Sequence, residues 1–125
     1  MLNSAMSSAP PLALSVIIPA SNEEGWIGRC LEAVLDSDPV PGGAEVIVVA
    51  NGCTDRTADV ARAVPHAPGW QVLVLDLPEG AKPLALNVGD SAANGRVKAW
   101  LDADCVVSPP VFAQIVAALA ADRPL

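Results

Sequence analysis

The chain has 125 residues, of which 52% are hydrophobic, and its 14 acidic and 7 basic side chains give a net charge of −7. This length predicts a single domain, and the apolar content is too high for a disordered chain. A nucleic-acid partner is excluded by the acidic balance, because a phosphate-tracking surface needs the opposite charge. The same acidity suits a bound metal cation, or serves solubility alone.

The first 13 residues predict a flexible N-terminal tail, followed by one domain over residues 14–125. The tail lacks the basic start and the long apolar run of a signal peptide. No apolar run approaches the roughly 20 residues that span a bilayer. The three cysteines form neither a metal-binding spacing nor a disulfide framework, which indicates free thiols in a reducing compartment. We therefore expect a cytoplasmic protein with no transmembrane segment.

Strand and helix patterns alternate four times after this tail. Four short apolar runs predict buried strands, at Leu14–Pro19, Glu45–Ala50, Trp70–Leu75 and Val97–Leu101. Each run precedes a stretch whose apolar residues recur at helical spacing. The residues expected at the helix starts are Ser21 or Asn22, Thr54, Pro83, and Ser108 with Pro109. Gly95 is expected to end the third helix.

This alternation predicts an α/β fold with a parallel sheet and right-handed crossovers. Nearly continuous apolar strands are typical of a sheet covered by helices on both faces. With a change of direction between strands one and four, the expected strand order is 3-2-1-4 in a Rossmann-like three-layer sandwich.

Polar residues gather directly after the predicted strands. They are Ser21, Asn22, Glu23 and Glu24, then Asn51, Thr54 and Asp55, then Asp76, Glu79 and Lys82, and finally Asp102 and Asp104. In a parallel sheet these four groups meet at one edge, which is where open α/β sheets bind ligands. Each loop alone could be polar for solubility only, so the coincidence of four loops is what favours a binding site.

Asp102-Ala103-Asp104 is the motif among them that points most specifically to one kind of site. Carboxylates at positions i and i+2 leaving a strand can point the same way. Two of them suit a hard divalent cation that keeps its other positions for water and phosphate. Such a cation would bridge a diphosphate and neutralise the charge on a leaving nucleoside diphosphate. An acidic helix-entry loop is the plain alternative.

Four segments together resemble family 2 glycosyltransferases, whose fold is called GT-A. They are Ser15–Glu24, Val48–Asp55, Lys82–Asn87 and the D-x-D segment Leu101–Asp104, in the order and spacing of that family. The resemblance covers about Leu14 to Pro109. It implies the nucleotide-sugar-binding N-terminal half of such an enzyme.

The resemblance also implies roles for individual residues. The nucleotide-sugar would contact Pro19, Ala20, Glu23, Asn51, Lys82 and Asp102, and Mn²⁺ or Mg²⁺ would be held by Asp102 and Asp104. Family members often carry aspartate at the positions of Ala50 and Asn51, one of which contacts uracil. Many also have glycine at the position of Ala81. A UDP-, GDP- or TDP-linked donor therefore stays open.

In this family the second half supplies the acceptor site and a catalytic base, and few residues follow Asp104 here. No catalytic residue is therefore expected in this chain, and transfer would need a completing half or a partner chain that supplies it. Without that half, the fourth strand is a sheet edge with unpaired backbone groups, which predicts a homo-oligomer.

Three other readings compete with this one. A non-catalytic interaction domain with the GT-A fold would keep the sheet and lose the chemistry. A phosphatase of the haloacid dehalogenase type would also use a segment such as Asp102–Val106, but after its first strand. A receiver-like signalling domain would likewise need its acidic pair after strand one, where Glu23 and Glu24 are poor substitutes.

Overall fold

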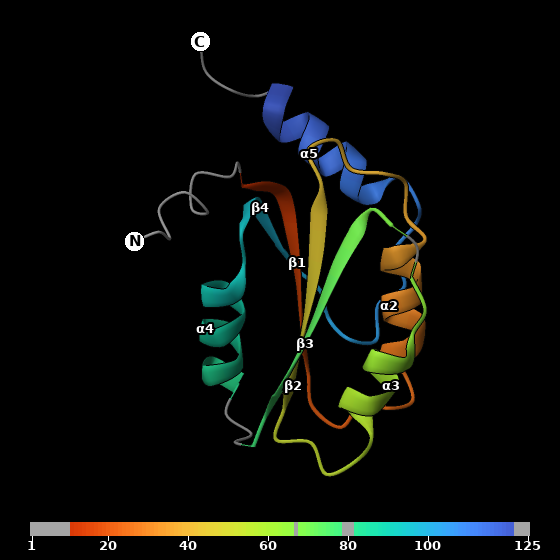
Figure 1. Ribbon diagram of the computed structural model, residues 1–125, viewed down its shortest axis with the longest axis vertical. Helices are drawn as coiled ribbons and strands as arrows, with labels where there is room; N and C mark the ends of the chain where they lie inside the picture. The colour runs from red at the N-terminus through yellow and green to blue at the C-terminus, as the bar shows by residue number, and fades with distance from the viewer. Residues whose placement is uncertain (1–10, 67, 79–81, 122–125) are drawn as a thin grey trace.

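A computed structural model of the protein describes residues 11–66, 68–78 and 82–121 (Figure 1). Within these described residues, strands and helices alternate. The elements are β1 (Leu12–Ala20), α2 (Ile27–Leu35), β2 (Ala44–Asn51), α3 (Thr57–Ala63), β3 (Trp70–Leu77), α4 (Lys82–Ala92), β4 (Gly95–Trp100) and α5 (Val111–Ala121). No helix in the described part of the chain is long and apolar enough to cross a membrane.

The four strands form one parallel sheet in the order β3-β2-β1-β4. This confirms the fold class and the strand order predicted from the sequence. The central strand β1 pairs on both sides, so that Ile17 lies opposite Ile47 of β2 and Trp100 of β4. All carboxyl ends of the strands therefore point to the same edge of the sheet.

Helices cover both faces of this sheet, as the apolar strands predict. Figure 1 shows α4 on one face, with α2, α3 and α5 on the other. The larger core lies beneath these three helices and takes alternate residues of β1, among them Val16 and Ile18. The smaller core lies under α4 and contains Ile17, Ile47 and Ala85. An edge-to-face contact between Trp70 and Phe112, with ring centroids 5.9 Å apart, joins α5 to β3.

Several element boundaries differ from the sequence expectation. Strand β1 begins at Leu12, inside the predicted tail, because the amide of Ala13 donates to the carbonyl of Gly43 at 3.0 Å. Helix α2 begins well after Ser21 and Asn22, and its N-cap residue, Trp26, makes no side-chain capping bond. The structural reason is that the side chain of Asn22, one of the two residues expected to cap α2, accepts a hydrogen bond from the amide of Thr54 instead.

Two of the other three helices, α3 and α5, also begin later than predicted. Helix α3 begins at Thr57 rather than next to Thr54, and its N-cap Arg56 likewise makes no side-chain capping bond. Helix α5 begins at Val111, two residues beyond Pro109. Helix α4 begins at Lys82, which puts Pro83 in its first turn as expected.

Gly95 does not end a helix; it is the first residue of β4. A Cβ at this position would lie 2.4 Å from both the carbonyl carbon of Leu14 and the amide nitrogen of Ser15. The prediction that Gly95 ends the third helix was wrong, because this glycine allows the backbone of β4 to approach the backbone of β1 closely. The amide of Gly95 donates to Oγ of Ser15 at 2.7 Å, and that hydroxyl donates to the buried carboxylate of Glu45 at 2.5 Å.

We expect Gly95→Ala to lower the free energy of unfolding by at least the roughly 1–3 kcal/mol that overpacking a core costs. The neighbouring atoms are backbone and cannot rotate away. Gly25→Ala is the matched control, because a Cβ at Gly25 meets nothing within 4 Å. Chemical denaturation of both variants measures the difference, and equal stabilities would contradict this account of Gly95.

Candidate functional site

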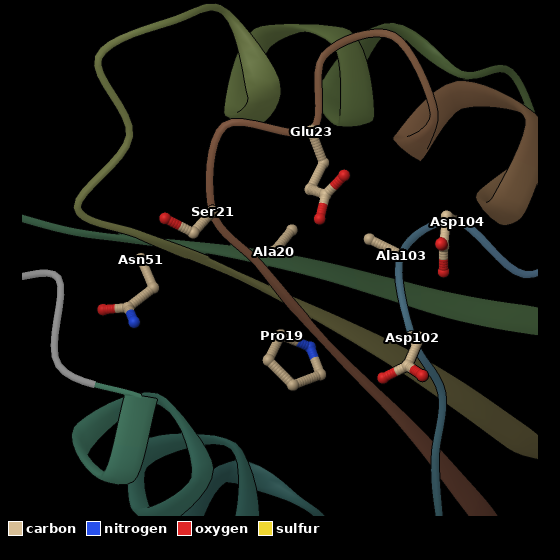
Figure 2. Close-up of a pocket in the computed structure, with 8 residues that line it drawn as sticks. All are labelled: Pro19, Ala20, Ser21, Glu23, Asn51, Asp102, Ala103 and Asp104. Carbon is tan, nitrogen blue, oxygen red and sulfur yellow. The ribbon is translucent and has the colours of Figure 1, made fainter.

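A cavity of about 330 Å³ lies at the carboxyl ends of β1, β2 and β4 (Figure 2). Its volume falls within the range of small-molecule sites. Its lining residues come from three separate segments of the chain, and they are Pro19, Ala20, Ser21, Glu23, Asn51, Asp102, Ala103 and Asp104. Figure 2 shows the Glu23 side chain descending between Asn51 on one side and the residues after β4 on the other.

The D-x-D residues are held by backbone bonds on both sides. The amide of Leu101 donates to the carbonyl of Ile17 at 2.9 Å, which extends the pairing of β4 with β1 to the start of this loop. The amide of Cys105 donates to the carbonyl of Asp102 at 3.0 Å and closes a turn. Ala103 is buried in the larger core while Asp102 and Asp104 on either side are exposed. Because exposed and buried side chains alternate along this segment, both carboxylates face solvent.

The loop after β1 is bound to the loop after β2. Asn22 adopts a positive φ of 54°, and its Oδ1 accepts a hydrogen bond from the amide of Thr54 at 2.8 Å. The amide of Glu23 donates to Oγ1 of Thr57 at 2.8 Å. The first bond occupies the side chain of Asn22, which was expected to cap a helix, and the second fixes the backbone of Glu23.

Asp55 and Glu24 complete this connection. The amide of Glu24 donates to the Asp55 carboxylate at 3.2 Å, and the amide of Arg56 donates to the Glu24 carboxylate at 3.1 Å. The hydroxyl of Thr57 also donates to Asp55 and, together with the amides of Glu24 and Thr57, holds the pKa of Asp55 below its usual value. The two loops therefore form one unit at the edge of the cavity.

Asn51 supplies the cavity with an unpaired polar atom. It is the last residue of β2 and is only 4% exposed. Among the described residues, its Oδ1 is a buried side-chain oxygen with no hydrogen-bond partner. Burying a polar atom without a partner costs about 1–3 kcal/mol. A ligand that donates a hydrogen bond here would remove that cost.

The carboxylates at this site concentrate negative charge. The ion pairs formed within the described part of the chain join Asp59 to two arginines and Asp90 to Lys98. None of them involves Glu23, Asp102 or Asp104. A cation is therefore the natural complement of this edge of the sheet.

Cys30 of α2 lies beneath the D-x-D loop, and the negative charge of that loop affects the pKa of its thiol. Its Sγ donates to the carbonyl of Asp102 at 3.6 Å. Burial first, and then the negative charges of Cys105, Asp104 and Asp102, raise the pKa of this thiol to about 12. Cys30 therefore stays protonated, and its role is to pack beneath the loop.

The structure brings most of the site residues predicted from the sequence together. Pro19, Ala20, Glu23, Asn51, Asp102 and Asp104 all line the one cavity. Lys82 is the first residue of α4, which begins at the same edge of the sheet, but its side chain lies outside the described structure. Ser21 and Ala103 line the cavity without having been assigned a role. Their positions beside Ala20 and inside the D-x-D segment are the signals that could have included them.

A second cavity of about 490 Å³ adjoins the first and shares Pro19 and Asp102 with it. Leu86 of α4, Trp100 and Leu101 make it more apolar, and Cys105 completes its lining. Asp102 therefore stands between a polar cavity and a largely apolar one. Cys105 follows Asp104 directly in the sequence, and the family resemblance implied no role for it.

Fold and cavity together define a Rossmann-like α/β domain, whose ligand site is expected where the strand order reverses between β1 and β4. The model of the family described as "Glycosyl transferase family 2" matches residues 15–125. Glycosyltransferase AglE of Haloferax volcanii is 38% identical over 101 residues, which cover 80% of this chain and 33% of that protein.

Two solved structures show the same fold. The mannosyltransferase PcManGT from Pyrobaculum calidifontis, in complex with GDP-Man and Mn²⁺, has a TM-score of 0.78 and 28% identity, covering 90% of this chain and 33% of that one. S. aureus TarS 1–349, in complex with UDP-GlcNAc, has a TM-score of 0.77 and 23% identity, covering 88% of this chain and 32% of that one.

The chain therefore belongs to glycosyl transferase family 2, and its sheet is that of the GT-A fold. It spans about a third of the length of AglE and PcManGT. The family and the fold rule out the phosphatase and receiver readings, whose acidic residues follow the first strand, whereas Asp102 follows β4.

We expect a thiol reagent at mildly alkaline pH to modify Cys53 and Cys105 in the folded protein and Cys30 only after denaturation. Cys30 is fully buried, whereas the other two are partly exposed. Because its pKa of about 12 lies above the usual 9.0, folding holds this proton more tightly than the unfolded chain does. The free energy of unfolding should then fall as the pH rises from about 9 towards 12, and less steeply in Cys30→Ala. Rapid modification of all three native thiols would contradict the burial of Cys30.

Proposed function

We propose that this chain binds a nucleotide-sugar and a divalent cation in the cavity at the carboxyl edge of its sheet, as the donor-binding part of a glycosyltransferase. The observation that carries the proposal is the shared cavity. Asn51, Asp102 and Asp104 line the same space, and within the described part of the chain the Asn51 oxygen has no hydrogen-bond partner and the two carboxylates form no ion pair. A hydrogen-bond donor and a cation are the two complements that these groups lack.

The nucleoside would lie against Pro19 and Ala20, with its base at Asn51. An asparagine offers both a donor and an acceptor, whereas the aspartate common in the family accepts only. A base that presents an N–H beside a carbonyl fits this amide, and uracil, thymine and guanine all do so. UDP-, TDP- and GDP-linked sugars therefore remain the candidate donors. Lys82 stays a predicted contact of base or phosphate.

Asp102 and Asp104 would hold the cation, and Asp102 would also approach the ribose. We propose Mn²⁺ or Mg²⁺, in line with the Mn²⁺ in the PcManGT complex. When bound, the cation would neutralise charge on the diphosphate. This chain's own residues would position the nucleoside, and Glu23, fixed through its backbone by Thr57, would border the site.

The activity of the whole protein is a further step of the proposal. Transfer of the sugar would require acceptor-binding groups and a base, which the family carries in its second half. We expect no appreciable transfer by the 125-residue chain alone. A non-catalytic binding domain is the alternative, and the cytoplasmic location stays a prediction.

Calorimetry with UDP-, GDP- and TDP-sugars, each with and without Mn²⁺, tests the binding proposal. We expect one donor class to bind, with an affinity that depends on Mn²⁺. Asp104→Asn should abolish that metal dependence and leave the fold intact. Asp38→Asn, an exposed carboxylate away from the cavity, is the control and should bind as the unaltered chain does. Absence of binding to every donor in the presence of metal would overturn the proposal.

We also propose that the chain self-associates through β4, with a partner chain that completes the sheet as the alternative. Strand β4 pairs only with β1 among the described strands, and Trp100 on it is 46% exposed. Light scattering should show a mass above that of the monomer, and Trp100→Arg should lower it. Trp26→Arg, at a residue 52% exposed next to α2, should not. A monomer at high protein concentration would contradict this.

A further inference from the structure

The turn after β4 brings a cysteine to the two candidate metal ligands. Asp102, Asp104 and Cys105 each offer one ligand atom, and these atoms all lie within 4.8 Å of one another. Two ligands of one ion are never farther apart than the sum of their bond lengths, about 4.4 Å for a sulfur and an oxygen. Small rotations therefore suffice to reach bonding distances, because both aspartates are exposed and Cys105 is only partly buried.

We propose that Sγ of Cys105 is the third protein ligand of the divalent cation and gives the site a preference for softer cations over Mg²⁺. This rests on the proposed function of the cavity. A set of two carboxylate oxygens and one sulfur is a poor match for Mg²⁺, which takes oxygen ligands. Sulfur ligands favour the later transition metals, so Co²⁺ and Zn²⁺ should bind more tightly than Mn²⁺, and Mn²⁺ more tightly than Mg²⁺.

The backbone holds the three donors together without the metal. The hydrogen bond from the amide of Cys105 to the carbonyl of Asp102, at 3.0 Å, closes the turn that contains all three residues. Burial of Ala103 in the core anchors the middle of that turn. Cys30 is not an alternative sulfur ligand, because it is fully buried and already donates to the carbonyl of Asp102.

The positions of the donors also fit a shared ligand. Asp104 lines the first cavity, Cys105 lines the second, and Asp102 lines both. The three side chains therefore meet at the boundary between the two spaces. The first of these spaces has a separate feature that favours a ligand, since it is lined by Asn51, whose buried amide oxygen has no hydrogen-bond partner among the described residues.

Cobalt absorption spectroscopy on the full chain tests this assignment without measuring activity. Titration with Co²⁺ in the presence of a phosphine reductant should produce a sulfur-to-cobalt charge-transfer band in the near ultraviolet. Cys105→Ser should lose the band, and its preference for Co²⁺ over Mg²⁺ should decrease. Cys53→Ser should keep both, and it is a matched control because Cys53 is also a partly exposed thiol.

A second measurement needs no variant. Bound Co²⁺ should slow alkylation of Cys105, located by peptide mass spectrometry, and should leave the rate at Cys53 unchanged. Calorimetric Co²⁺ binding with no charge-transfer band and no protection would overturn the role of Cys105 while leaving the aspartate site standing. Absence of any Co²⁺, Mn²⁺ or Mg²⁺ binding, with and without a nucleoside diphosphate, would overturn both proposals.

Discussion

The position of the site depends on the backbone pairing of β1 with β4, which the bond from Leu101 to Ile17 extends to the D-x-D loop. Because of this pairing, Asp102 leaves the sheet beside Pro19, although the two residues are far apart in the sequence. Strand β1 is also paired with β2 and is buried along most of its length. A shift of register in either pairing would separate the carboxylates from the loops that form the rest of the cavity. The candidate site therefore depends on the buried centre of the sheet.

Side chains, and not helix caps, stabilise the loops above this sheet. Asn22 and Thr57 accept hydrogen bonds from backbone amides of the opposite loop, while the carboxylate of Asp55 does the same for Glu24. Each of these residue types normally competes for amides close to it in sequence. Here the parallel sheet places two loops next to each other, so that the nearest unpaired amides belong to a different segment. The helices α2 and α3 begin without side-chain caps as a result.

This explains how far the sequence could predict the structure. Apolar runs such as Glu45–Ala50 are readable because burial on both faces of a sheet leaves a continuous pattern. The strand order followed from handedness and from the reversal between β1 and β4. The helix starts and the role of Gly95 were not readable, because they depend on contacts between distant segments. Cys105 was overlooked for a different reason: it follows Asp104 directly, but its closeness to Asp102 comes from a turn that no periodicity reveals.

The electrostatics of the cavity link its two proposed ligands. Asp102 and Asp104 repel each other, and no ion pair in the described part of the chain relieves that repulsion. A diphosphate alone would add negative charge to an edge that already carries too much of it. A cation bound first would reverse this relation, because it would be held by the carboxylates and would offer positive charge to the phosphates. Since a ligand that binds only the native state also stabilises it, the metal would strengthen the fold and the donor site together. Under the proposed function, the charge of this loop would therefore set the order of binding: the metal would precede the nucleotide or arrive with it.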